Sequence, residues 1–260
     1  MFEKWSPQKR IDEAKLVTKS LVDHIHYILD LHENNAVAIY SDTLTKQINR
    51  SDAAAAFFVF QSAMYQFEIV RLCALWDRPT LDRESIMTVV ELIDADAVIQ
   101  ALSDETRASY SNQSTAIYEQ DHETEEIRKL ISEAVRISEA DYADQQASQA
   151  TSDLRNAIKA TREFESSGLM ASLRNYRDKY LAHSLRTTQL KKRGPVMPLK
   201  YGNETTVLEK SLPIIEALYC WVNGTGISLT ASRENDRNNA RALWQACQFK
   251  LDLPDAAATA

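Results

Sequence analysis

The sequence predicts an all-α fold, a helical bundle with additional flanking helices, on three observations. Only five glycines and six prolines occur in 260 residues. The hydrophobic residues, 44% of the chain, come in long stretches with few turn residues between them. Within these stretches the apolar positions recur every three or four residues, as they do on one side of a helix. We therefore expect very little β-sheet.

The first part of the chain is predicted to hold two long helices. Residues 8–40 carry apolar positions at helical spacing, and a polar stretch at 41–49 follows. The second helix, at about 52–76, ends near Pro79, because proline disfavours helical continuation. This helix is apolar almost all the way round, and we therefore expect it in the middle of the domain.

Charged residues interrupt this apolar helix. Glu68 and Arg71 project, together with Gln61, among its phenylalanines, and a buried charge needs a partner. Two interpretations stay open. Glu68 and Arg71 lie three residues apart and can pair with each other, or one of them lines the cleft of a functional site.

The middle of the chain is predicted to be helical with one polar interruption. Residues 85–93 form a short amphipathic segment, and residues 95–112 have helical character. Between 113 and 165 we expect two helices. The DYADQQASQATS stretch at 141–152 has little to bury and is typical of a connection between them.

The last part of the chain is predicted to contain three helices. The first, at 169–185, follows Gly168, and a loop broken by glycines and prolines follows at 191–203. Two helices, at about 206–221 and 231–249, come next. The NGTG sequence between them is a stop signal.

Residues 1–250 are expected to form a single domain, and residues 251–260 a disordered tail, because no repeat or clear linker divides the chain. The N-terminus lacks the basic start and the apolar run of a signal peptide. No stretch approaches the roughly 20 apolar residues of a membrane span. We therefore expect a cytoplasmic protein with no membrane association.

Charge and cysteine content narrow the function classes. The formal net charge of −7 argues against a general nucleic-acid coat protein, which needs an excess of lysine and arginine over a broad surface. A small basic pocket is compatible with this charge. Cys73, Cys220 and Cys247 are too few and too far apart for a disulfide framework or a CxxC pair. This pattern indicates a reducing environment.

Two further groups of residues carry weaker signals. His24 and His26 are two residues apart and diverge by about 200° on a helix, and with His32 they lack the i,i+4 spacing of zinc helices. We expect no metal site, and no fingerprint indicates a cofactor. The basic run KKR at 191–193 can hold an RNA backbone or can simply be solvated.

The expected helix at 169–185 carries the segment RDKYLAH at 177–183. A helix advances about 100° per residue, which gathers six apolar residues on its packing face: Leu169, Met170, Leu173, Tyr176, Tyr180 and Leu181. Arg177 falls inside this face and His183 at its edge, about 120° from Arg177. Such violations of an apolar pattern tend to mark functional sites. The alternative is structural: an arginine that reaches solvent or a carboxylate, and a histidine satisfied within the fold.

The amino-acid sequence of this segment favours a functional role over a structural one. The order RDKxxAH at 177–183 resembles the Arg-x(4–6)-His motif of the HEPN superfamily, in its bacterial abortive-infection (AbiU2-like) branch. The segment LCALWDR at 72–78, followed by SI at 85–86, is similar to an earlier part of the same branch. The resemblance covers roughly residues 50–225, the expected core of a HEPN-like domain.

This resemblance implies a metal-independent endoribonuclease that acts as a toxin or antiphage effector. Cleavage by the ribose 2′-OH needs a base and a cation, and the products carry a 2′,3′-cyclic phosphate and a 5′-hydroxyl. His183 titrates near neutral pH and suits the first task. Arg177 stays charged and offers a planar set of donors for the second.

The resemblance also implies a homodimer. Arg177 and His183 point about 120° apart on one α-helix, and in HEPN enzymes the motif strips of two subunits face each other in a composite cleft. Four residues would support this cleft or contact RNA, unless they are solvated surface or a structural pair: Asp178, Lys179, Arg71 and Glu68. A cognate antitoxin often restrains toxins of this kind.

Two alternatives remain open on the same sequence. One is a non-catalytic HEPN-like module that binds a nucleotide, RNA or protein partner. The other is a helical assembly protein in which Arg177 only holds a helix in place. All three interpretations predict helices, so the fold class does not separate them.

Overall fold

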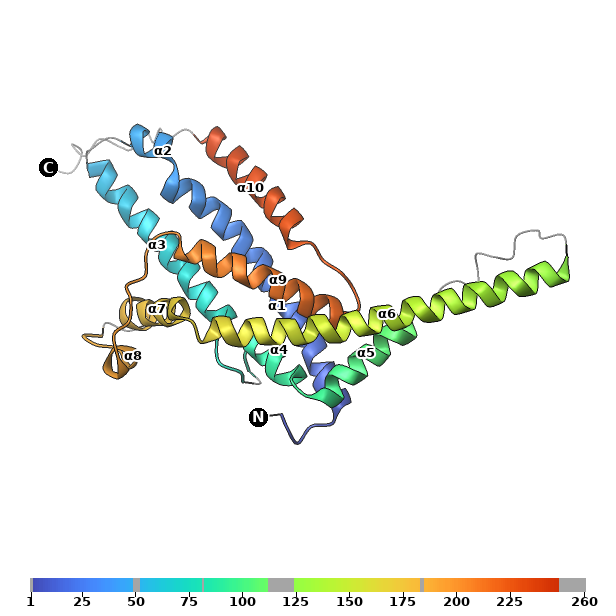
Figure 1. Ribbon diagram of the computed structural model, residues 1–260. Coiled ribbons are helices and arrows are strands. Elements are labelled where there is room, and N and C mark those ends of the chain that lie inside the picture. Colours follow the sequence, from blue (N-terminus) through green and yellow to red (C-terminus); the bar gives the residue numbers. More distant parts are fainter. Residues whose placement is uncertain (1, 49–51, 81, 112–123, 183–184, 248–260) are drawn as a thin grey trace.

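The computed structural model describes residues 2–48, 52–80, 82–111, 124–182 and 185–247, and the regular structure within them is helical, which confirms the all-α prediction (Figure 1). The first half contains α1 (Pro7–Tyr40), α2 (Asp42–Gln47), α3 (Asp52–Leu75), α4 (Ile86–Ile93) and α5 (Asp96–Tyr110). The second half contains α6 (Glu125–Glu165), α7 (Gly168–Tyr176), the π-helix η1 (Arg177–Leu181), α8 (Gln189–Arg193), α9 (Asn203–Asn223) and α10 (Leu229–Ala246).

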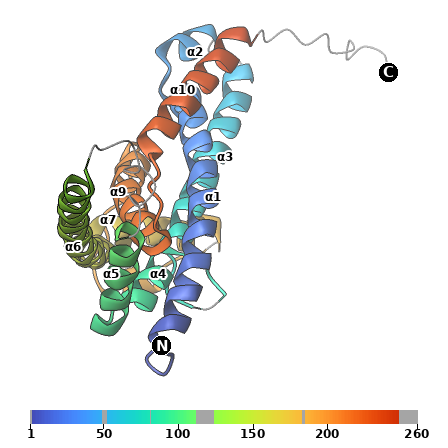
Figure 2. The same ribbon diagram turned by 90° about the vertical axis from the view of Figure 1, so that its right-hand side faces the viewer.

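Helices from both halves of the chain pack against α1. Ser6 begins this helix by accepting a hydrogen bond from the Lys9 N–H, and Pro7 occupies its first turn. α1 contacts α3, α4, α5, α9 and α10. Figure 2 shows α5 and α9 between α1 and α6, so that α6 forms an outer layer.

The core is closed where α3 ends. Trp76 is fully buried, and its indole Nε1–H donates to Ser211 Oγ on α9 at 2.8 Å. Its ring lies edge-on to Phe164 of α6. Arg10 of α1 donates from Nε to the Leu92 carbonyl at 2.6 Å and so satisfies the C-terminal end of α4. These polar contacts fix the ends of α3 and α4 relative to α1, α6 and α9.

The prediction that α3 lies in the middle of the domain is wrong for the first half of this helix. The residues buried in this region include Tyr65 and those residues from Ile69 to Trp76 that face inward. By contrast, Phe58 is 61% exposed and Val59 is 67% exposed. Phe67 is also exposed. α3 therefore has an apolar face that no described helix covers.

The prediction of two helices between 113 and 165 is also wrong, because α6 runs without a break from Glu125 to Glu165. The polar stretch at 141–152 is helical and packs closely against α5. Ala143, Ala147 and Ala150 are buried there, and Ser103 Oγ of α5 donates to the Ala147 carbonyl at 2.8 Å. Small side chains permit this approach, so the segment buries its surface without large apolar residues.

Among the described residues, none of the helices is both long enough and apolar enough to cross a membrane. The tail expected to be disordered, residues 251–260, lies outside the described residues.

Candidate functional site

The two sequence segments that carry the resemblance meet at the end of α3. Arg177 Nη1 lies 3.1 Å from Asp77 Oδ1. One turn earlier, Arg174 donates from Nη2 to the carbonyl of Trp76 at 2.8 Å. On the other side, Ser85 Oγ donates to the Asp77 carbonyl at 3.0 Å. Residues about 100 positions apart in the chain therefore build one site.

Two carboxylates orient the Arg177 side chain. Its Nε and Nη2 lie 3.0 and 2.9 Å from Asp178 Oδ1, and its Nη1 contacts Asp77. A guanidinium has five N–H groups, so these contacts leave two for a ligand. The side chain is 27% exposed. Burial opposes its charge, but interactions with Cys73, Asp178 and Asp77 together raise the pKa of Arg177 above its ordinary value.

The segment at 177–181, called the strip below, is not the α-helix that the sequence predicts. It is wound as a π-helix, in which the Ala182 N–H donates to the Arg177 carbonyl, five residues earlier, at 2.9 Å. A π-helix turns less per residue than an α-helix, so the angle of 120° between Arg177 and His183 does not apply. Tyr180, expected on the packing face, is 59% exposed. His183 itself lies outside the described residues.

The helix before Arg177 is anchored by its apolar face. Met170 and Leu173 are fully buried, as predicted, and Ser167 accepts a hydrogen bond from the Met170 N–H. Arg174 adds an ion pair to Glu165 at the end of α6, with 2.8 Å between Nη1 and Oε1. The position of Arg177 is thus fixed by α3, α6 and the core together.

A polar cavity of about 470 Å³ lies beside Asp77. Arg83 Nη1 lies 3.3 Å from Asp77 Oδ2, so Asp77 connects this cavity to Arg177. Arg71 lines the cavity with its guanidinium 5.0 Å from the ring centre of Tyr27, and its buried Nε has no hydrogen-bond partner among the described residues. The other lining residues are Ser20, Asp23, His24, Ala74 and Glu84.

His24 is held uncharged in this cavity. Its Nε2 is buried and lacks a hydrogen-bond partner within the described residues. Burial, followed by the charge of Arg71, lowers the pKa of His24 from 6.5 to about 4, while Glu84 opposes the change. The unfolded chain binds the proton below about pH 6.5 and the folded chain only near pH 4. The contribution of His24 to stability is therefore complete above pH 6.5 and is lost as the pH falls toward 4.

We expect a substitution of His24 to reduce the acid sensitivity of the fold. The melting temperature is measured at pH 7 and pH 5 for the wild type and for His24→Gln. The variant should lose less of its melting temperature between these two values. Ser20→Ala changes the same cavity without removing a titrating group and should keep the wild-type difference. Equal pH dependence in His24→Gln and wild type would contradict this assignment.

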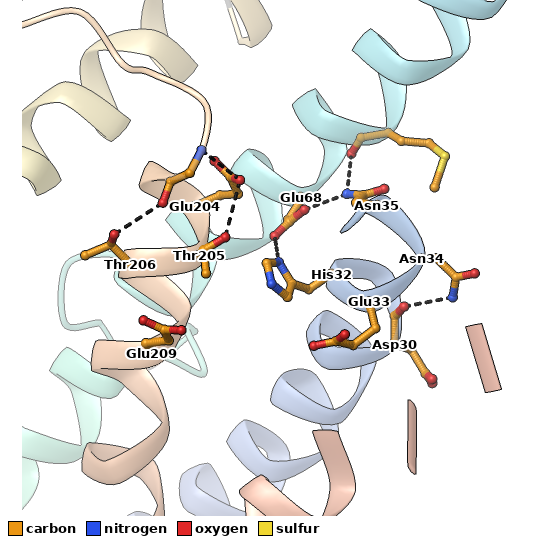
Figure 3. A network of polar contacts seen from close by, with 12 residues as sticks. Asp30, His32, Glu33, Asn34, Asn35, Glu68, Glu204, Thr205, Thr206 and Glu209 are labelled. Carbon is orange, nitrogen blue, oxygen red and sulfur yellow. Dashed lines mark hydrogen bonds and ion pairs between the residues drawn. The ribbon is translucent and has the colours of Figure 1, made fainter. Parts of the chain in front are cut away.

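Glu68 lies in the interior, away from Arg71. Figure 3 shows it on α3 facing two residues of α1: His32 Nδ1 lies 2.7 Å from Glu68 Oε1, and Asn35 Nδ2 donates to Oε2 at 2.5 Å. Glu68 has no exposed surface. The pairing of Glu68 with Arg71 is therefore wrong, and a direct contact of Glu68 with RNA is not carried forward.

A comparison with known protein families identifies the family of this chain. The model of the HEPN-type AbiU2 family matches residues 18–243. The chain belongs to the AbiU2 family. No curated protein and no solved structure matches the chain. Membership makes it a HEPN-type module of an abortive-infection family, and the match includes both segments that meet at Asp77 and Arg177.

In this AbiU2-family chain the predicted site residues fall into separate groups. Arg177 and Asp178 contact each other, and Arg71 lies in the neighbouring cavity. Lys179 points along the strip instead, with its Nζ donating to the Tyr180 hydroxyl at 2.9 Å. Sequence reasoning gave no role to Asp77, although the LCALWDR segment contains it, and no pattern in the sequence pointed to Arg174.

Proposed function

We propose that the chain is a metal-independent endoribonuclease of the HEPN type that acts as a toxin or antiphage effector. The observation that supports this most directly is the arrangement of Arg177 between Asp77 and Asp178. A charged, oriented and partly exposed guanidinium suits the stabilisation of charge that develops on a phosphate. Because its orientation is already fixed, little reorganisation is needed when that charge develops.

The proposed reaction needs one base and one cation. His183 takes the proton from a ribose 2′-OH, and the resulting oxygen attacks the adjacent phosphorus. Arg177 donates hydrogen bonds to the non-bridging oxygens as negative charge builds on them. The bond between phosphorus and the 5′ oxygen breaks, that oxygen takes a proton from water, and His183 releases the proton it received from the 2′-OH to the hydroxide left behind. The products carry a 2′,3′-cyclic phosphate and a 5′-hydroxyl.

A homodimer with a composite site belongs to this proposal. The uncovered apolar face of α3, with Phe58 and Val59 more than 60% exposed, supports a contact with a second copy. This face leads to the site, because Phe67 lies edge-on to Tyr27, with 6.3 Å between the ring centres, and Tyr27 lies under Arg71.

An enzyme that degrades the RNA of its own cell requires restraint. We therefore place the protein in the cytoplasm, where its RNA substrate is found, and propose a cognate antitoxin as a further partner. The chain needs neither a metal nor a cofactor for the reaction described above, because a base and a cation are both supplied by side chains.

The decisive experiment incubates the purified protein with mixed RNA in EDTA. The wild type is expected to cut RNA and to leave cyclic phosphate and 5′-hydroxyl ends, which end-specific labelling detects. His183→Ala should lose about 10²- to 10⁴-fold in rate, the usual contribution of a general base. The ends of the products report the chemistry independently of the rate.

Three results would count against this proposal. Intact RNA with the wild type would favour the non-catalytic module that binds a nucleotide, RNA or protein partner. Equal cleavage by His183→Ala would remove the histidine from the mechanism. Cleavage that EDTA abolishes would replace the metal-independent reaction with a metal-dependent one.

A further inference from the structure

Four tyrosine rings form a continuous row that includes the residues flanking Arg177 in the chain, Tyr176 and Tyr180. The ring centres of Tyr201 and Tyr65 are 4.8 Å apart, those of Tyr65 and Tyr176 are 6.3 Å apart, and those of Tyr176 and Tyr180 are 5.2 Å apart. Tyr65 is buried, whereas Tyr201 and Tyr180 at the two ends are 60% and 59% exposed. The row thus has a buried middle and two aromatic ends in solvent.

The chain segment that carries Tyr180 and Tyr201 is basic, although the whole chain is acidic. Residues 177–202 contain seven lysines and arginines and one acidic residue, Asp178, while the whole chain has a net charge of −7. Lys179 Nζ lies 4.6 Å from the ring centre of Tyr180. The hydrogen bond and the charge of Lys179 lower the pKa of Tyr180, and the charge of Lys191 adds to this shift.

The fold holds both ends of the row in place. Thr188 is buried, accepts a hydrogen bond from the Lys191 N–H at the start of α8, and donates to the buried Asn175 of α7. This contact ties α8 and its cations to the strip. At the other end, the Tyr65 hydroxyl contacts the Lys200 carbonyl.

The turn after Tyr201 is fixed as well. Gly202 adopts a positive φ of 87°, which favours glycine, and its N–H lies 3.0 Å from the Tyr40 hydroxyl and 3.1 Å from Glu204 Oε1. Tyr40 itself donates to Glu204. Tyr201 is therefore an exposed ring on a rigid turn, not a side chain at the tip of an unsupported loop.

We propose that this row is the subsite that binds single-stranded RNA by base stacking. Bases stack on the exposed rings of Tyr180 and Tyr201, and the phosphates between them contact Lys179 and Lys191. Exposed aromatic faces combined with local cations are the means by which proteins bind unpaired strands, and duplex bases are already stacked on each other. The inference rests on the proposed nuclease function, because Tyr176 and Tyr180 flank Arg177 in the chain and Tyr180 belongs to the same π-helix as Arg177.

The test measures binding without cleavage. A fluorescent 2′-O-methyl RNA strand of about 12 nucleotides lacks the free 2′-OH that the proposed reaction requires, and its Kd follows from fluorescence anisotropy. Tyr180→Ala and Tyr201→Ala are each expected to weaken binding by about tenfold, since a stacked base contributes about 1–3 kcal/mol. Tyr180→Phe and Tyr201→Phe keep the aromatic face and should bind as the wild type does.

A matched control is available on α6. Tyr142 is 49% exposed and also contacts a second tyrosine ring, Tyr110, at 5.4 Å, but it lies outside the basic region. Tyr142→Ala should leave the Kd unchanged. A duplex of the same sequence, offered as a competitor, should displace the labelled strand at least tenfold less well than an unlabelled single strand.

The outcomes separate this inference from the nuclease proposal. If binding depends on Tyr180 and Tyr201 but the RNA stays intact in EDTA, the subsite is supported and the nuclease proposal is wrong. If RNA is cleaved but the Kd is unchanged in both alanine variants, the nuclease proposal stands and the subsite is wrong. Equal competition by the duplex also overturns it. If the wild type does not bind the strand at all, the subsite is wrong and the surface is left to a protein partner.

Discussion

Replacement of Arg177 by alanine is expected to lower kcat/KM for RNA cleavage by about 10²- to 10³-fold, the usual effect of removing one donor that stabilises a developing anion. The effect should be large because the guanidinium is already oriented. Asp178 holds Nε and Nη2, and Asp77 holds Nη1. Initial rates on a single labelled RNA, measured in EDTA, give the value.

Lysine at the same position should restore little of this loss. An ammonium group is a point charge, and it does not reproduce the planar set of donors that contacts two carboxylates and still offers N–H groups to a phosphate. Arg177→Lys is therefore expected to stay closer to the alanine variant than to the wild type. A lysine variant with near wild-type activity would show that charge alone is sufficient.

The same variants test the composite site. If the arginine of one subunit acts with the histidine of the other, co-expressed Arg177→Ala and His183→Ala chains form mixed dimers with one intact pair. Such mixed dimers should be active, although each variant alone is not. A mixture as inactive as its components would place both residues of a working site on one chain.

The helices that could be predicted are those whose signals are local. α1 spans Pro7–Tyr40 against an expected 8–40. α4 spans Ile86–Ile93 against an expected segment at 85–93, and Ser85 accepts a hydrogen bond from the Thr88 N–H at its start. Apolar spacing and a capping side chain both act within a few residues. No knowledge of distant partners is needed to recognise them.

Predictions failed where a partner decides the outcome. Ala143, Ala147 and Ala150 carry no strong apolar signal, yet they are buried because α5 approaches closely at that point. Conversely, Phe58 and Val59 are strongly apolar but no described helix covers them. The sequence of one helix does not show where a neighbouring helix will pack against it, so burial by that neighbour could not be predicted.

The candidate site divides in the same way. The letters of the motif identified Arg177, but its main ion-pair partner outside the strip, Asp77, lies 100 residues earlier. The π-helix could not be predicted either, because its hydrogen bond from residue 182 to residue 177 replaces the α-helical pattern without a sequence signature. The role of His183 remains a prediction from the motif.

The buried Glu68 carboxylate leads to the largest expected effect on stability. We expect His32→Leu to lower the free energy of unfolding by about 3 kcal/mol or more, because a buried acceptor left without its donor costs about 1–3 kcal/mol, and a charged one costs more. Arg233 Nη2 lies 3.2 Å from His32 Nε2, and an arginine can only donate. His32 Nε2 is therefore the acceptor, and Nδ1–H donates to Glu68. Without the ring, one carboxylate oxygen loses its donor.

In His32→Leu, the residue left without a needed hydrogen bond is Glu68 and not Arg233. Arg233 Nε keeps its contact of 2.6 Å with Glu33, whereas Glu68 keeps only Asn35. Unfolding in urea gives the free energies. As a matched control, Lys159→Ala removes one partner of the exposed pair with Glu163 on α6 and should cost less than about 1 kcal/mol.

A double substitution shows whether the stranded charge is the cause. With both His32→Leu and Glu68→Leu, the position holds two apolar side chains and no buried carboxylate, and apolar replacement of a whole buried pair is often neutral. Most of the loss should then be recovered. If the double variant is as unstable as the sum of both single variants, the cause is the packing of α1 on α3 instead. If His32→Leu costs no more than Lys159→Ala, Asn35 alone satisfies the carboxylate.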